Sequence, residues 1–198
     1  PPTRSSRRRR RRPPSGALTL LMKALPPGKP VTLIGHSMGT IILNELVRHH
    51  PDRSFDRIVY MAAACTIEDF ANAIPGYLKS PAGAQTRFHL LTLHPEADRS
   101  ENVTWSILPH GSLLHWLDNF VLGPRTKLQK TLGQWNNFVE CLGVLEPDLG
   151  PVRERVFIKG FPLEGKKYPY MHGSFDEFPY WRSSFWDPAD TGPPLPRE

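Results

Sequence analysis

The most constraining feature of the sequence is the motif Gly35-His36-Ser37-Met38-Gly39, which stands between two regular segments. Residues 31–34 are apolar and β-branched, as expected of a buried parallel strand. Residues 40–50 carry apolar side chains at helical spacing and are closed by a proline. A strand that passes so directly into a helix must turn sharply, and the two glycines are expected to give strand and helix room there. We therefore expect Ser37 to project from a strained turn above a sheet.

The segments that follow continue the pattern of a parallel sheet. Residues 57–64 are predicted to form a second buried strand, so the order strand, turn, helix, strand is a βαβ unit. Residues 87–93 and 155–161 are two further strand candidates, and residues 17–25 are predicted to form a short helix that ends at a Pro-Pro-Gly sequence. The predicted fold class is α/β, a mostly parallel sheet with flanking helices.

A helical insert at about residues 99–154 separates the last two strand candidates. It contains two apolar helical stripes, which consist of Leu113, Trp116, Leu117, Phe120 and Val121, and of Leu132, Trp135, Phe138, Val139 and Leu142. Such stripes most commonly pack into a core, and beside a functional site they can also form a lid over an apolar ligand. The sequence leaves both interpretations open.

The formal charge of +6 is concentrated near the N-terminus, where seven of the 25 basic residues lie between Arg4 and Arg12. A run of this kind repels itself and has no apolar face, so we expect residues 1–15 to form a disordered tail. The domain is predicted to span residues 16–186, and residues 187–198 to form an irregular Pro-rich tail. Because no aromatic residues alternate with the arginines to stack on bases, the sequence does not favour nucleic acid as a partner.

Other features bound the class of protein. No apolar run reaches the roughly 18 residues that a membrane-spanning helix needs. Cys65 and Cys141 do not form a disulfide framework, and buried thiols fit a cytoplasmic location. The histidines at positions 94, 110 and 115 do not match the spacing of metal ligands.

With its flanking segments, the motif resembles the elbow of the α/β-hydrolase superfamily, in particular of its serine esterases and lipases with the Gly-His-Ser-Met-Gly form. The resemblance implies that Ser37 is a nucleophile and that the backbone N–H of Met38 helps to bind an oxyanion. It implies hydrolysis of a carboxylic ester or related acyl compound through an acyl-enzyme, with a small-molecule acyl substrate that includes lipid-like compounds. No metal or organic cofactor is implied.

The same resemblance implies an acid after the third strand and a histidine after the fourth. His172 stands where the histidine is expected, and Asp98 is the expected acid, with Glu96 as the reserve. Asp118, which is expected to face solvent on its helix, is a third candidate if the insert folds back. The chain order Ser37, Asp98, His172 agrees with the order in this superfamily.

Members of that superfamily carry several strands before the elbow, and one of their early loops supplies a second oxyanion donor. Here only residues 16–30 lie between the predicted tail and the first strand. The resemblance therefore implies an N-terminally truncated member, with one flank of its sheet unpaired, which we expect to be unstable or inactive alone. The alternative function is that of a non-catalytic, hydrolase-like fragment whose Arg-rich arm binds a polyanion.

Overall fold

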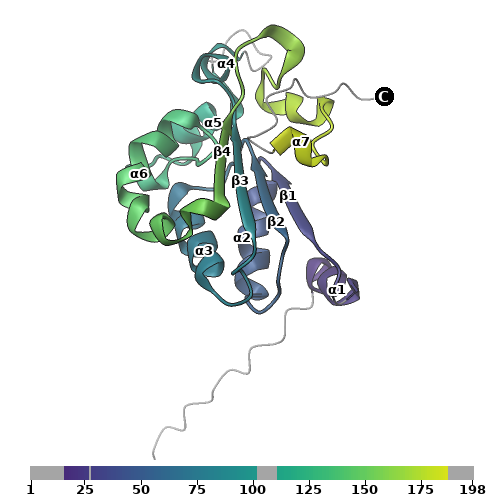
Figure 1. Cartoon of the computed structure of the whole chain (residues 1–198). Coiled ribbons are helices and arrows are strands. Elements are labelled where there is room, and N and C mark those ends of the chain that lie inside the picture. The colour runs from purple at the N-terminus through teal and green to yellow at the C-terminus, as the bar shows by residue number, and fades with distance from the viewer. Residues whose placement is uncertain (1–15, 27, 102–110, 187–198) are drawn as a thin grey trace, which may run out of the picture.

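The computed structural model describes residues 16–26, 28–101 and 111–186. Its centre is a four-stranded, all-parallel sheet (Figure 1). The strands are β1 (Thr32–His36), β2 (Arg57–Met61), β3 (Arg87–Thr92) and β4 (Val156–Gly160), in the order β1-β2-β3-β4. All four predicted strands are present, and the α/β class is confirmed. The two predicted tails, residues 1–15 and 187–198, lie outside the described residues.

Helices precede β1, occupy the connections between the strands and follow β4. They are α1 (Ala17–Ala24), α2 (Gly39–His49), α3 (Ile67–Lys79), α4 (Pro95–Ser100), α5 (Leu113–Trp116), α6 (Trp135–Leu149) and α7 (Ser183–Trp186). A π-helical turn, η1 (Leu117–Val121), continues α5, and four 3-10 segments are η2 (Lys127–Gln129), η3 (Gly150–Arg155), η4 (Gly165–Lys167) and η5 (His172–Glu177). Among the described residues, no helix has the length and apolar character needed to cross a bilayer.

The two faces of the sheet are covered by different parts of the chain. Side chains that alternate along the strands, such as Tyr60 and Leu90, pack with α2, α3 and α6 in the larger core. Their neighbours Val59 and Leu91 point to the opposite face, where they pack against residues 161–186. This C-terminal segment is therefore a layer of the fold, and it carries His172 over the sheet (Figure 1).

Strand β1 differs from its prediction as a buried strand. It lies at the end of the sheet order and pairs with β2 alone, and of its residues only Gly35 is buried. The hydrophobic run in its sequence is also found in central strands, so the run by itself does not distinguish an edge from a centre. One edge of the described sheet thus carries unpaired backbone groups.

The structure agrees only in part with the two apolar stripes predicted for the insert. Helix α6 buries Phe138, Cys141, Leu145 and Leu149, whereas Val139 and Leu142 are 43% and 40% exposed. The helix begins at Trp135, so Leu132 lies before it, and the buried face follows the helical spacing from Phe138. In the first stripe, Leu113, Phe120 and Val121 are exposed and Leu114 is buried instead. The stripe of α6 therefore serves the core, which is the commoner of the two uses considered.

Candidate functional site

Ser37 occupies the sharp turn that the sequence predicts between β1 and α2. Its φ of 53° lies in the left-handed region, which is uncommon for a residue with a side chain. The Ser37 N–H donates to Met61 O (2.9 Å), and Ser37 O accepts from the N–H groups of Thr40 (3.1 Å) and Ala64 (3.2 Å) and from Thr40 Oγ1 (2.7 Å). The end of β2 and the first turn of α2 thus hold the strained residue in place.

The two glycines of the motif have different surroundings. A Cβ on Gly35 would lie 2.8 Å from Cδ1 of Leu43 and 3.1 Å from backbone atoms of Gly39 and Thr40. A Cβ on Gly39 would meet no atom within 4 Å in the described part of the chain. The expectation that both glycines make room for the helix is therefore right for Gly35 and wrong for Gly39.

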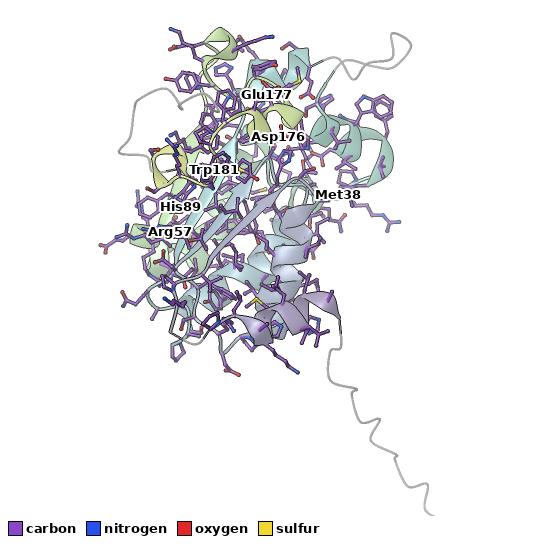
Figure 2. All side chains as sticks on the ribbon, turned by 90° about the vertical axis from the view of Figure 1, so that its right-hand side faces the viewer. Met38, Arg57, His89, Asp176, Glu177 and Trp181 are labelled. Atoms are coloured by element: carbon purple, nitrogen blue, oxygen red, sulfur yellow. The ribbon has the colours of Figure 1, made fainter. Side chains whose placement is uncertain are left out.

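The imidazole of His172 lies against Ser37, with 2.8 Å between Nε2 and the Ser37 Oγ. His172 begins η5, after β4, so the chain crosses from the far edge of the sheet to reach β1. With strands about 4.8 Å apart, that crossing spans roughly 14 Å. Figure 2 shows this end of the molecule, where Asp176 and Glu177 of η5 lie above Met38 at the start of α2. The structure thus brings together the two side chains expected to act as nucleophile and base.

Two side chains are bonded to the backbone of His172. Its carbonyl accepts a hydrogen bond from His36 Nε2 (2.8 Å), and its N–H donates to Oε2 of Glu101 (2.7 Å). Burial, followed by the nearby His36, lowers the pKa of His172 to about 4, so the ring is neutral at neutral pH. The Nδ1 atom is buried and has no hydrogen-bond partner among the described residues.

Met38 is the residue that precedes α2, and its side chain is 66% exposed. The N–H groups of Thr40 and Ile41 are bonded to Ser37 O and Met38 O, whereas the Met38 N–H makes no hydrogen bond with the described residues. The start of a helix attracts negative charge, because its first N–H groups point out of it. This N–H is therefore available to an oxyanion formed next to Ser37.

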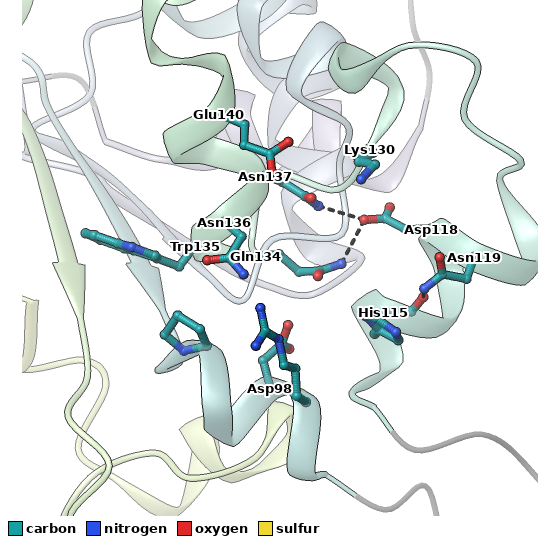
Figure 3. Close-up of a pocket in the computed structure, with 12 residues that line it drawn as sticks. Asp98, His115, Asp118, Asn119, Lys130, Gln134, Trp135, Asn136, Asn137 and Glu140 are labelled. Carbon is teal, nitrogen blue, oxygen red and sulfur yellow. Dashed lines mark hydrogen bonds between the residues drawn. The ribbon is translucent and has the colours of Figure 1, made fainter.

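Asp98, the expected acid, lies on α4, and its described contacts are with residues other than His172. Its backbone O accepts from the Ser112 N–H (2.7 Å), and its buried carboxylate borders a polar pocket of about 190 Å³ that Arg99 and His115 also line (Figure 3). Burial is the main cause that raises its pKa. No hydrogen bond joins Asp98 to His172 within the described residues, so the structure gives no contact in support of the expected role.

Asp118 corrects a second expectation, since it is buried rather than directed to solvent. Its Oδ1 accepts from the Thr131 N–H (2.8 Å), and its Oδ2 accepts from Gln134 Nε2 and Asn137 Nδ2 (both 2.7 Å) and from Thr131 Oγ1 (3.1 Å) (Figure 3). The insert folds around this carboxylate, and the hydrogen bonds account for its burial. The reserve candidate, Glu96, is exposed.

Glu101 is the carboxylate that the sequence analysis does not single out. It follows α4 directly, three positions after Asp98, in the connection between β3 and α5. The sequence itself limits the candidate acids in this connection, because residues 102–110 contain neither Asp nor Glu. The acids between β3 and α5 are therefore limited to Glu96, Asp98 and Glu101.

Comparisons of the chain with models of protein families, with curated proteins and with solved structures found no match. Across the described ranges, no group of three His, Cys, Asp or Glu side chains is placed to hold a metal ion. His110 lies outside those ranges.

Replacement of Gly35 by Ala should destabilise the fold far more than replacement of Gly39 by Ala. The added methyl group at position 35 must displace the backbone at the start of α2, whereas position 39 has space for it. We expect Gly35→Ala to lower the free energy of unfolding by about 1–3 kcal/mol and Gly39→Ala to change it by less than about 0.5 kcal/mol, as measured by urea denaturation. Equal losses for the two variants would contradict the assignment of the close contact to Gly35.

The variant Asp118→Ala should be strongly destabilised. It leaves the buried Thr131 N–H without its acceptor and removes one of the two acceptors of the Asn137 amide, and an unsatisfied buried group costs about 1–3 kcal/mol. Thermal unfolding followed by circular dichroism should show a clear loss for Asp118→Ala and almost none for Asp176→Ala, whose side chain is exposed. A variant Asp118→Ala as stable as the parent would rule out the structural role.

The variant Asp98→Asn should be more stable than the parent at neutral pH. Because burial raises the pKa of Asp98, the unfolded chain loses this proton at a lower pH than the folded chain does. The parent therefore loses stability as the pH rises above about 3.9, the usual value for Asp. Asparagine carries no charge, so its burial does not depend on pH. Denaturation at several pH values should show an advantage for Asp98→Asn at pH 7 that shrinks toward pH 3, and a disadvantage at pH 7 would refute the explanation.

Proposed function

We propose that the protein hydrolyses a carboxylic ester or a related acyl compound, with Ser37 as the nucleophile and His172 as the base. The observation that carries the proposal is the 2.8 Å contact between His172 Nε2 and the Oγ of a serine in the left-handed conformation, at a turn from strand to helix. A serine hydroxyl is a weak nucleophile unless a base removes its proton, and here the base is in hydrogen-bonding distance. The proposal places the fold in the α/β-hydrolase superfamily.

The reaction follows from these positions. Ser37 Oγ attacks the acyl carbon while its proton passes to His172 Nε2, and the carbonyl oxygen becomes an oxyanion beside the Met38 N–H. His172 then gives the proton to the leaving alcohol as the bond to the acyl carbon breaks, which leaves an acyl group on Ser37. A water molecule attacks this ester in the same way, with His172 again as the base, and releases the acid and free Ser37.

The surroundings of His172 suit this use. The lowered pKa keeps Nε2 unprotonated at neutral pH, so it accepts the Ser37 hydrogen. The hydrogen bond from His36 to the His172 carbonyl fixes the backbone of the base relative to the elbow, because His36 is itself part of the motif. The catalytic pair is therefore held by contacts that the motif supplies.

The first chemical step can be tested with a fluorophosphonate probe, which reacts covalently with activated serines. In the protein expressed from its natural gene, we expect one labelled site, lost in Ser37→Ala, and a labelling rate several powers of ten lower in His172→Gln. Ser184→Ala is the control at an exposed serine, and it should be labelled as the parent is. Absence of labelling in the parent, or labelling that persists in Ser37→Ala, would refute the proposed function.

A further inference from the structure

The buried Nδ1 atom of His172 identifies a missing interaction in the site. The proposed function requires Nε2 to accept from the Ser37 hydroxyl, 2.8 Å away, and a neutral imidazole in that state carries its proton on Nδ1. Among the described residues this N–H has no acceptor, and a buried donor without one costs about 1–3 kcal/mol. The ring also becomes an imidazolium when it takes the proton of Ser37, so an anionic acceptor would stabilise the reacting state most.

Glu101 is already bonded to the same residue. Its Oε2 lies 2.7 Å from the backbone N of His172, and both groups are shielded from solvent in part. Its second oxygen, Oε1, makes no hydrogen bond with the described residues and is thus free to bind elsewhere. A carboxylate has acceptor sites for several donors, so it can keep the backbone contact and accept another proton.

We infer that Glu101 is the positioning residue of this site, which accepts the Nδ1 proton of His172 and holds the ring toward Ser37. The inference rests on the proposed function, since the pair Ser37 and His172 needs an oriented base only if it is catalytic. No atom is transferred to Glu101, because the carboxylate stays ionised while His172 alone gains and loses the proton.

The other described carboxylates between β3 and α6 face other groups or solvent. Asp98 borders the polar pocket that Arg99 and His115 line, Asp118 accepts four hydrogen bonds from residues 131–137, and the Glu96 side chain is exposed. His36 offers no acceptor on its Nε2, which donates to the His172 carbonyl. Among these acids, Glu101 is therefore the one that is hydrogen-bonded to His172.

The variant Glu101→Gln separates a structural role from a positioning role. Its amide oxygen can still accept from the His172 N–H, whereas the negative charge is lost. We expect kcat for a p-nitrophenyl ester to fall roughly 10²–10⁴-fold with KM little changed, as for the loss of a group that acts on the base. Glu154→Gln makes the same chemical change on an exposed side chain and should leave kcat, KM and thermal stability as in the parent.

Two results would overturn the inference while leaving the proposed function intact. One is a parent labelled at Ser37 together with a Glu101→Gln variant of nearly normal kcat, and the other is a loss of kcat in Asp98→Asn with Glu101→Gln active. A parent that is not labelled at all overturns both proposals.

A measurement on the parent decides the matter if Glu101→Gln does not fold. Nitrogen-15 NMR of the histidine rings should show His172 as the Nδ1–H tautomer, with Overhauser contacts from this proton to the methylene protons of Glu101. An Nε2–H tautomer, or an Nδ1 proton without those contacts, would exclude Glu101 as the positioning residue.

Discussion

The site depends on the strained turn at Ser37. A left-handed conformation at a non-glycine residue costs of order 1–3 kcal/mol, and it persists here because four hydrogen bonds to Met61, Thr40 and Ala64 fix the backbone. Gly35 allows the start of α2 to approach β1 at a distance that any larger side chain would prevent. As a result the hydroxyl of Ser37 stands at the carboxyl end of the sheet, directly before the start of α2, where the Met38 N–H makes no hydrogen bond with the described residues.

His172 reaches this serine through aromatic packing in the C-terminal layer. Phe161, Phe175 and Phe185 are almost fully buried and contact one another, with ring centres 5.1–6.5 Å apart. Burial of a phenylalanine side chain is worth about 1.5–3 kcal/mol, so these residues fix the path of the chain across the sheet. His36 lies against Phe175 and His172. The position of His172 thus depends on contacts at both edges of the sheet, the aromatic residues that follow β4 and His36 of β1, and not on the loop after β4 alone.

The sequence predicts what is local in this arrangement and fails where contacts are distant. The strands, the turn at Ser37 and the place of His172 follow from hydrophobic runs, the motif and its resemblance. Helix α3 has no predicted counterpart because Pro75 lies inside it, although Thr66 caps it by accepting from the Asp69 N–H. Burial of Asp118 depends on donors 13 to 19 positions away. No spacing rule distinguishes Asp98 from Glu101, which lie one turn apart.

The short helix α4 connects residues of the insert with His172. Ser112 N–H donates to Asp98 O (2.7 Å) and Gly111 N–H to Glu101 O (2.9 Å), so the residues directly before α5 are bonded to the same turn that carries Glu101. Burial raises the pKa of Glu101, and the charge of Asp98 raises it further, whereas the His172 N–H lowers it. A displacement of the insert would therefore move Glu101 and change its electrostatic surroundings together. The insert is in this sense part of the support of His172, even though its α6 stripe packs into the core.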